Sequence, residues 1–260
     1  MTDQPVAIIS AGASGIGLSC ARALAAAGYR VLTLDINVEA VAAFEAEFGE
    51  GTAVVCDVSH PAQVETAFAS LMGACDRVDV LLNNAGIAGP QQPVEEIEVE
   101  AWQSTINTDL NSLFYLTRLV IPLMKLQRSG VILNMYSSAG RYGCPLRSPY
   151  VASKWAAIGL AQTWAMELGP WNIRVNVLCP GSVGGERIER VIQRDAEERG
   201  VSAEDIRTVY QRQSSLRDFA SAEDIAAMVC FLSGPGGRMV SGQTIGIDGH
   251  TESLANWLDP

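Results

Sequence analysis

The sequence predicts one α/β domain, residues 1–260, built on a doubly wound parallel sheet of seven strands. Seven short apolar runs recur along the chain with helical patterns between them, an order typical of a parallel sheet covered on both faces. The runs are nearly continuous in Val, Ile and Leu, as strands buried on both faces require. No linker rich in Pro, Gly or Ser divides the chain. The expected strands cover residues 6–10, 30–35, 52–56, 78–83, 130–136, 174–179 and 244–248.

The composition indicates a folded domain without nucleic-acid partners. The chain has 260 residues, of which 48% are hydrophobic, enough to build a sizeable core. It carries 29 acidic and 18 basic side chains, and its net charge is −11. Nucleic-acid binding needs basic side chains that neutralise phosphates, and the sequence has no run of Lys or Arg. DNA and RNA partners are therefore not expected.

Membrane insertion, export and metal binding are not expected either. The longest uncharged stretch, residues 4–21, contains Pro5 and three glycines and so does not predict a transmembrane helix. The amino terminus lacks the basic region of a secretory signal. The six cysteines form no CxxC pair, and His60 and His250 lie far apart, so no metal site is expected. We expect reduced thiols and a cytoplasmic location.

A glycine-rich turn follows the first expected strand. Residues 10–17 have the sequence SAGASGIG, and a helical pattern over residues 18–27 comes directly after them. Such a turn lets the backbone approach a dinucleotide pyrophosphate, and the amino terminus of the next helix favours an anion. The alternative is an ordinary tight connection from strand to helix. The expected cofactor contacts here are Ser10, Gly12, Ser14, Gly15, Ile16 and Gly17.

An acidic residue at the end of the second strand predicts which dinucleotide binds. Asp35 stands eighteen residues after Gly17. A carboxylate at this position accepts hydrogen bonds from ribose hydroxyls and repels a 2′-phosphate. Ile36 follows it, and no Lys or Arg lies in the turn to neutralise such a phosphate. We therefore expect NAD rather than NADP.

The ends of the third and fourth strands complete the expected cofactor site. Asp57 and Val58 follow the third strand, and Asp57 can accept a hydrogen bond from the adenine amino group. Residues 83–86 have the sequence NNAG, and small side chains there leave room for a cofactor. Open α/β sheets bind ligands at the carboxyl ends of their strands. The expected contacts are Asp57, Val58, Asn84, Ala85 and Gly86.

A tyrosine and a lysine form the expected catalytic pair. Tyr150 and Lys154 are four residues apart on one expected helix, so their side chains share a face. Ser137 stands thirteen residues before Tyr150, just after the fifth strand. A phenol with a pKa of roughly 10 is a weak base at neutral pH, but a nearby ammonium and an oxidised nicotinamide favour its anion. The pattern predicts proton transfer by Tyr150, orientation of a substrate oxygen by Ser137, and contact of Lys154 with the nicotinamide ribose.

These motifs together resemble the short-chain dehydrogenase/reductase family over nearly the whole chain. The resemblance rests on the glycine-rich turn, Asp57, NNAG, Ser137, the Tyr150-x-x-x-Lys154 pair and the segments 180–181 and 241–249. It implies a Rossmann fold, an NAD(P)-dependent reaction between an alcohol and a carbonyl, and usually a homotetramer. It also implies that the loop with Pro180, Gly181 and Val183 contacts the nicotinamide.

Two loops of the chain depart from the family's pattern. The family's turn usually begins with Thr-Gly, whereas this chain has Ser10-Ala11. The Ser10 hydroxyl can replace the hydrogen bond of the threonine. After Pro180 the family often carries a threonine that binds the nicotinamide carboxamide, and here that register gives Gly185. We expect an altered cofactor affinity and a more mobile loop.

A third departure concerns the catalytic residues themselves. Alignment on Trp102 and Phe114 places Asp109 where the family's fourth catalytic residue, an asparagine, is usual. A carboxylate there could preserve a proton relay while it pairs with Lys154. It could instead weaken the effect of Lys154 on Tyr150. We expect an active enzyme with Asp109 among its catalytic residues.

Two helical segments predict further surfaces. Residues 184–217 are charged and helical, and they predict either a lid over the site or an ordinary solvated helix pair. The helix that opens at Tyr150 has no charge between Lys154 and Glu167. A helix that is apolar all round is buried, so its second face predicts a subunit contact and a homo-oligomer. Trp155 and Trp164 are expected in the core or in that contact.

The substrate is expected to be small and polar. Arg141, Tyr142 and Arg147 lie between Ser137 and Tyr150, and Arg187 opens the expected lid. Guanidinium groups suit carboxylate or phosphate substrates, although they could equally pair with the abundant acids. We expect a sugar, polyol or hydroxy acid whose secondary alcohol is interconverted with a ketone. The alternatives are reduction of a 3-oxoacyl thioester and a non-catalytic NAD-binding sensor.

Overall fold

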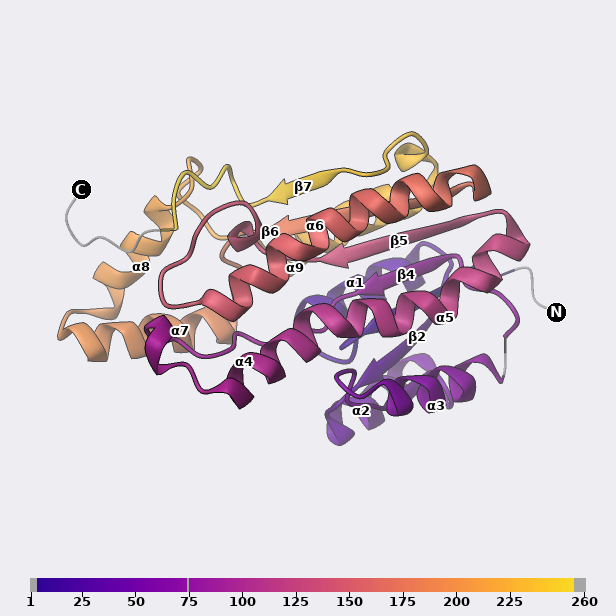
Figure 1. Ribbon diagram of the computed structural model, residues 1–260, viewed down its shortest axis with the longest axis horizontal. Coiled ribbons are helices and arrows are strands. Elements are labelled where there is room, and N and C mark those ends of the chain that lie inside the picture. Colours follow the sequence, from indigo (N-terminus) through magenta and orange to yellow (C-terminus); the bar gives the residue numbers. More distant parts are fainter. Residues whose placement is uncertain (1–3, 74, 255–260) are drawn as a thin grey trace.

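The core of the computed structural model, which describes residues 4–73 and 75–254, is a seven-stranded sheet with every strand parallel (Figure 1). The strand order is β3-β2-β1-β4-β5-β6-β7, and it reverses between β1 and β4, which confirms the doubly wound prediction. All strands begin and end within two residues of their expected positions. Their bounds are β1 Val6–Ser10, β2 Arg30–Asp35, β3 Ala53–Val55, β4 Val80–Asn83, β5 Gly130–Met135, β6 Ile173–Pro180 and β7 Thr244–Ile247.

Helices cover both faces of the sheet. On one face lie α3 (Pro61–Met72), α5 (Ser112–Gln127) and α6 (Ser148–Leu168). On the other lie α1 (Gly15–Ala26), α2 (Val38–Phe48) and α9 (Ala222–Ser233). Figure 1 shows α5 and α6 in front of the strands and α1 and α9 behind them. This layering follows from strands that must bury side chains on both sides.

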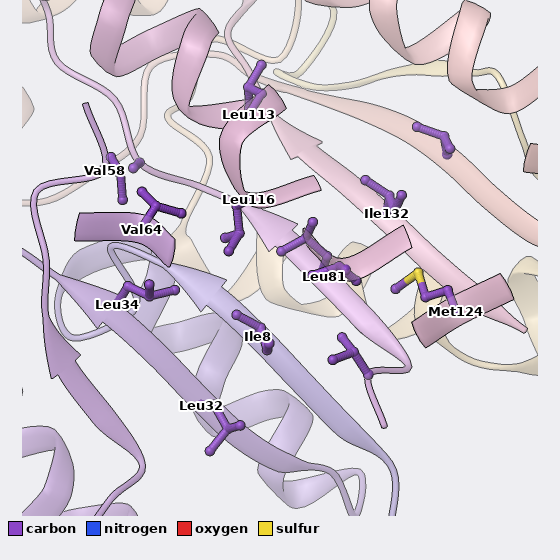
Figure 2. Close-up of a cluster of buried hydrophobic side chains, with 14 of the residues drawn as sticks. Ile8, Leu32, Leu34, Val58, Val64, Leu81, Leu113, Leu116, Met124 and Ile132 are labelled. Atoms are coloured by element: carbon purple, nitrogen blue, oxygen red, sulfur yellow. The ribbon is translucent and has the colours of Figure 1, made fainter. Parts of the chain in front are cut away.

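Alternate residues of each strand fill two separate clusters of the core. Ile8, Leu81 and Ile132 of neighbouring strands point to the face of α3 and α5, where they pack with Val64 and Leu116 (Figure 2). The residues that follow them along the strands point to α1 and α9. Burial of each such side chain stabilises the fold by about 1.5–3 kcal/mol. The continuous apolar runs in the sequence therefore correspond to strands that are buried on both faces of the sheet.

The remaining helices lie near the carboxyl ends of the strands. α4 (Val99–Ile106) continues through one π-helical turn, η2 (Asn107–Asn111), into α5. The segment 184–217 forms two helices, α7 (Glu186–Arg199) and α8 (Ala203–Arg212), which Figure 1 shows beyond the arrowheads of the strands. Ile188, Ile192 and Ile206 form a small core between these two helices. Their action as a lid stays a prediction.

Helix α6 begins two residues earlier than the sequence pattern indicates, because Pro149 suits the first turn of a helix. Its inner side covers the sheet, whereas Trp155 and Met166 are 52% and 81% exposed in the single chain. Trp164 packs against the core. A subunit contact through this outer side stays a prediction. Within the described ranges, no helix is long and apolar enough to span a lipid bilayer.

The two-sided core makes a stability prediction. Leu81 is fully buried, so Leu81→Ala should leave a cavity and lower the free energy of unfolding by roughly 2–5 kcal/mol. Leu126, which is 84% exposed, is the matched control. Leu126→Ala should change the free energy of unfolding by less than about 0.5 kcal/mol. Urea unfolding at one protein concentration measures both. Equal effects of the two substitutions would contradict this account of the core.

Candidate active site

The glycine-rich turn is anchored to β2 by side chains of that strand. The Gly12 N–H donates to Thr33 Oγ1 at 2.9 Å, and this hydroxyl donates to the carbonyl of Ile9 at 2.8 Å. The Ala13 N–H donates to Asp35 Oδ2 at 3.1 Å. Two polar side chains of a buried strand thus hold the turn in one conformation. The contribution of Thr33 was not predicted, and its signal is a polar residue inside the apolar run of β2.

The turn has no room for a side chain at Gly17, whereas the place for a side chain at Gly15 is open. A Cβ on Gly17 would lie 2.2 Å from the carbonyl oxygen of Ala11, so only glycine lets the helix approach the turn. Gly15 has a φ of 51°, and no atom lies within 4 Å of the place for its Cβ. In the described chain, Ser14 makes no side-chain cap and the first turn of α1 has no acidic residue. The backbone N–H groups at the amino terminus of α1 are therefore suited to bind an anion.

Ser10 ties the turn to the end of β4. Its hydroxyl accepts hydrogen bonds from the N–H groups of Asn84 and Ala85 at 2.9 and 3.0 Å. The Asn84 amide donates in turn to the carbonyl of Ala11 at 2.9 Å. Ser10 thus supplies a hydrogen bond where the family usually has threonine. Ala11 carries the strain of this departure, because its φ is 51°, a left-handed value that favours glycine.

Two carboxylates mark the adenosine end of the expected cofactor site. Asp35 is buried, and its Oδ1 accepts the N–H of Asn37 at 3.1 Å. Ile36 beside it is exposed. Asp57 accepts two hydrogen bonds from Ser59 and lies 3.2 Å from the ring of His60. Burial opposes its charge, but these contacts outweigh burial and hold the pKa of Asp57 below its ordinary value.

The expected catalytic residues come from β5 and α6. Ser137 follows β5 and caps a short helical turn, η3 (Ser138–Gly140), by accepting the N–H of Ala139 at 3.2 Å. This turn packs directly on α6, because a Cβ on Gly140 would lie 3.1 Å from the carbonyl oxygen of Lys154. Lys154 Nζ lies 5.1 Å from the centre of the Tyr150 ring. The fold therefore places Ser137 beside the helix that carries Tyr150 and Lys154.

Asp109 completes this group from the π-helical turn η2. Its Oδ2 lies 3.2 Å from Lys154 Nζ as an ion pair, without the geometry of a hydrogen bond. Its Oδ1 accepts the N–H of Ile87 at 2.7 Å. The side chains of Asp109 and Lys154 are 0% and 4% exposed. The π turn widens the helix locally and points this carboxylate at the lysine, a common use of such turns.

Tyr136 is a neighbour of this pair that the sequence reasoning missed. Lys154 Nζ lies 5.2 Å from the centre of its ring. Among the described residues its buried hydroxyl has no hydrogen-bond partner. Burial raises the pKa of this phenol, and the charge of Asp109 raises it further. Burial also raises the pKa of the Cys179 thiol, on β6, to about 11. The signal for Tyr136 is a phenol at the end of an apolar strand, directly before Ser137.

The loop after β6 joins the site to the segment 184–217. The Gly181 N–H donates to the carbonyl of Ile247 at 3.1 Å. Val183 bridges Ala220, and the Ala220 N–H donates to the carbonyl of Ser182 at 3.0 Å. Gly185 caps α7 with a φ of 135°, a backbone conformation that favours glycine. The predicted cofactor residues thus lie at or just after the carboxyl ends of β1, β2, β3, β4 and β6, except for Tyr150 and Lys154, which lie on α6.

A small hollow lined mostly by polar residues lies between η3, α8 and the chain after β7. Hydroxyl groups and two carboxylates dominate it, and the buried Oδ2 of Asp248 has no hydrogen-bond partner within the described chain. The residues that line the hollow are Ser138, Ser182, Tyr210, Gln213, Ser214, Asp218, Asp248, Thr251 and Leu254.

Two of the four residues expected near the substrate, Arg147 and Tyr142, bond to other parts of the chain. Arg147 donates to the carbonyl of Ala88 and to the side chain of Gln91, so it links α6 to the loop after β4. Tyr142 donates to the carbonyl of Thr251 at 2.7 Å. Arg141 and Arg187 are exposed. None of these four side chains is among those that line the hollow.

Comparison with known proteins identifies the family of the chain. A family model described as enoyl-(acyl carrier protein) reductase matches residues 10–250. The chain is 35% identical over 248 residues to a 3-oxoacyl-(acyl-carrier-protein) reductase FabG of Thermotoga maritima, and the match covers 94% of this chain and 96% of that protein.

Two solved structures share the fold over almost the full length. NAD⁺-bound xylitol dehydrogenase superimposes with a TM-score of 0.86 at 29% identity, covering 94% of this chain and 97% of that one. A variant of actinorhodin polyketide ketoreductase with NADPH gives a TM-score of 0.89 at 30% identity, covering 98% of both chains. The chain therefore belongs to the short-chain dehydrogenase/reductase family of nicotinamide-dependent oxidoreductases.

Proposed function

We propose that this protein is an NAD-dependent oxidoreductase that interconverts a secondary alcohol and a ketone on a small polar substrate. The observation that carries the proposal is the buried ammonium of Lys154, which lies beside the Tyr150 ring at the carboxyl edge of the sheet. Burying a cation costs free energy even when an acid partly offsets it, so a buried lysine in a site with other ionisable groups is a candidate functional residue. Here it stands where it can favour the phenolate of a proton-transfer group.

The residues present fit a dinucleotide. The open backbone N–H groups at Ser14 and Gly15 would hold the pyrophosphate, and Asp35 would accept hydrogen bonds from the adenine ribose. Asp57 would receive the adenine amino group. Gly86 lies against Lys154, so a ribose held by this lysine would lie close to the loop after β4. A nicotinamide held there would supply the hydride acceptor for oxidation of the carbinol carbon, or the hydride donor for reduction of the ketone.

The chain's own residues supply the proton chemistry. Ser137 Oγ accepts a backbone N–H from Ala139, so its own proton is free to donate to the substrate oxygen and orient it. In the oxidative direction the substrate hydroxyl gives its proton to the Tyr150 phenolate. Lys154 stabilises that phenolate by its charge. Ser137 and Tyr150 thus hold the reacting oxygen while its bond to hydrogen breaks.

The hollow supports a hydroxyl-bearing substrate. Serine, tyrosine and threonine hydroxyls line it together with Asp218 and Asp248, and these groups bind the hydroxyls of a sugar or polyol. Of the guanidinium groups that would favour an anion, Arg147 is already engaged by Ala88 and Gln91. We therefore favour a sugar or polyol over a hydroxy acid.

A second candidate is reduction of a 3-oxoacyl thioester. The match to FabG favours it, as does the superposition on a polyketide ketoreductase. Asp35 argues against a 2′-phosphorylated dinucleotide such as the NADPH bound to that ketoreductase. A non-catalytic sensor of NAD is a third candidate, which the presence of Ser137, Tyr150 and Lys154 disfavours.

The turn predicts a requirement for glycine in cofactor binding. Gly17→Ala should weaken NAD binding at least about tenfold, because the added Cβ collides with the Ala11 carbonyl and displaces the turn. Gly159→Ala is the matched control, since no atom lies within 4 Å of the place for that Cβ on α6. Isothermal titration with NAD measures both. Wild-type affinity in Gly17→Ala would contradict the assigned site.

Asp35 predicts the cofactor preference. The wild-type protein should have a higher kcat/KM with NAD than with NADP, and Asp35→Ser should lower that ratio about tenfold by removing the charge that repels a 2′-phosphate. Asp57→Ser, at the adenine end, should weaken both cofactors alike and leave the ratio unchanged. A wild-type preference for NADP would refute the assignment to NAD.

The catalytic assignment predicts a loss of turnover with retained binding. Tyr150→Phe should lower kcat by roughly 10²–10⁴-fold and keep the affinity for NAD, because only the hydroxyl is lost. Tyr29→Phe, which removes a remote hydroxyl bonded to Ser233, should keep wild-type kcat. The absorbance of reduced nicotinamide follows turnover of polyols, hydroxy acids and oxoacyl thioesters. Preferential reduction of thioesters would favour the 3-oxoacyl thioester reductase. Binding of NAD without any turnover would favour the non-catalytic sensor.

A further inference from the structure

The buried ammonium of Lys154 is enclosed by three groups. The Asp109 carboxylate lies 3.2 Å from Nζ, and the rings of Tyr150 and Tyr136 lie 5.1 and 5.2 Å away. The ion pair is almost completely withdrawn from solvent. At short range in a buried site, a carboxylate acts strongly on the charges around it, because water screens the interaction little. Lys154 therefore does not act on Tyr150 as an uncompensated cation.

The carboxylate is held in this place by the fold. Asp109 Oδ1 accepts the Ile87 N–H, which fixes the side chain to the loop after β4. A Cβ on Gly86 would lie 3.3 Å from Lys154 Nζ and 3.4 Å from Asp109 Oδ1, so the backbone there leaves only enough room for the pair. The contact thus belongs to a packed site and differs from a mobile surface salt bridge.

The other ionisable groups around the pair do not replace this negative charge. Tyr136 and Cys179 face Lys154 from β5 and β6, and burial keeps both neutral by raising their pKa. The charge of the exposed Arg141 lowers the pKa of Cys179 and that of Asp248 raises it, and burial outweighs both. Among the described residues, Asp109 is the one acid that forms an ion pair with Lys154.

We propose that Asp109 is a positioning residue that offsets the charge of Lys154 and thereby raises the pH range in which Tyr150 gives up its proton. A cation beside a phenol favours the phenolate, and an anion behind that cation opposes it. The rings of Tyr136 and Tyr150 lie within cation–π distance of Nζ, so they also stabilise the ammonium beside Asp109. The inference rests on the proposed function, because it takes Tyr150 as the proton-transfer group.

The test is an absorbance titration of tyrosine in the cofactor-free protein. Asp109→Asn removes the charge and keeps an oxygen that can accept the Ile87 N–H. Subtracting the titration of the matching Tyr150→Phe protein isolates the Tyr150 phenol in each background. The midpoint in Asp109→Asn should lie about one pH unit below the wild-type midpoint. The acid limb of kcat/KM against pH should move in the same direction.

Asp79→Asn is the matched control. Asp79 also accepts one backbone N–H, from Val6 at 2.8 Å, and pairs with one cation, Arg77, at 2.7 Å. Asp79 directly precedes β4, so it lies at the amino end of that strand, away from the carboxyl end where the site lies. This substitution should leave the Tyr150 midpoint unchanged, whatever it does to stability.

An unchanged or higher midpoint in Asp109→Asn overturns the inference. If that variant does not fold, Asp109→Ser removes the same charge and is held to the same expectation. A lower midpoint in proteins that turn over none of the substrates tested would keep the inference and reject the proposed function. An active enzyme without the shift rejects the inference alone.

Discussion

The structure around the site depends on the need to compensate one buried cation. Removing an ammonium from water is costly unless an acid or other polar groups replace its hydration. Lys154 meets this need with Asp109, and Asp109 is itself fixed by a backbone N–H of the loop after β4. One ion pair therefore joins α6, the π turn before α5 and the carboxyl end of β4. These are the elements that surround the expected nicotinamide position.

The same edge of the sheet is held together by short polar links between neighbouring strands. Ser10 joins β1 to the residues after β4, and Thr33 and Asp35 join β2 to the turn after β1. These links run between backbone groups and side chains that are all buried, where hydrogen bonds matter most. A parallel sheet brings such residues to one edge, so the site is rigid on the side of the cofactor. The hollow beside Ser138, by contrast, is lined by residues of η3, α8 and the chain after β7.

Sequence reasoning predicted the fold and the cofactor end more fully than the surroundings of the lysine. Continuous apolar runs leave few alternatives to a buried parallel sheet, and a glycine such as Gly17 has few uses other than close approach. Tyr136 was missed and the partners of Arg147 were not predicted, because these contacts join residues far apart in the chain. The ring of Tyr136, just after β5, contacts Lys154 on α6, and Arg147 donates to the carbonyl of Ala88, 59 residues away. Local patterns carry no information about such contacts.

The central claim is that Tyr150, Lys154 and a bound dinucleotide meet at one carbon atom. A crystal structure of the protein with NAD tests this most directly. The account predicts Lys154 Nζ within hydrogen-bond distance of the nicotinamide ribose and the Tyr150 hydroxyl facing the reactive carbon of the ring. A dinucleotide bound elsewhere, or a Tyr150 hydroxyl turned away from the nicotinamide, would contradict it.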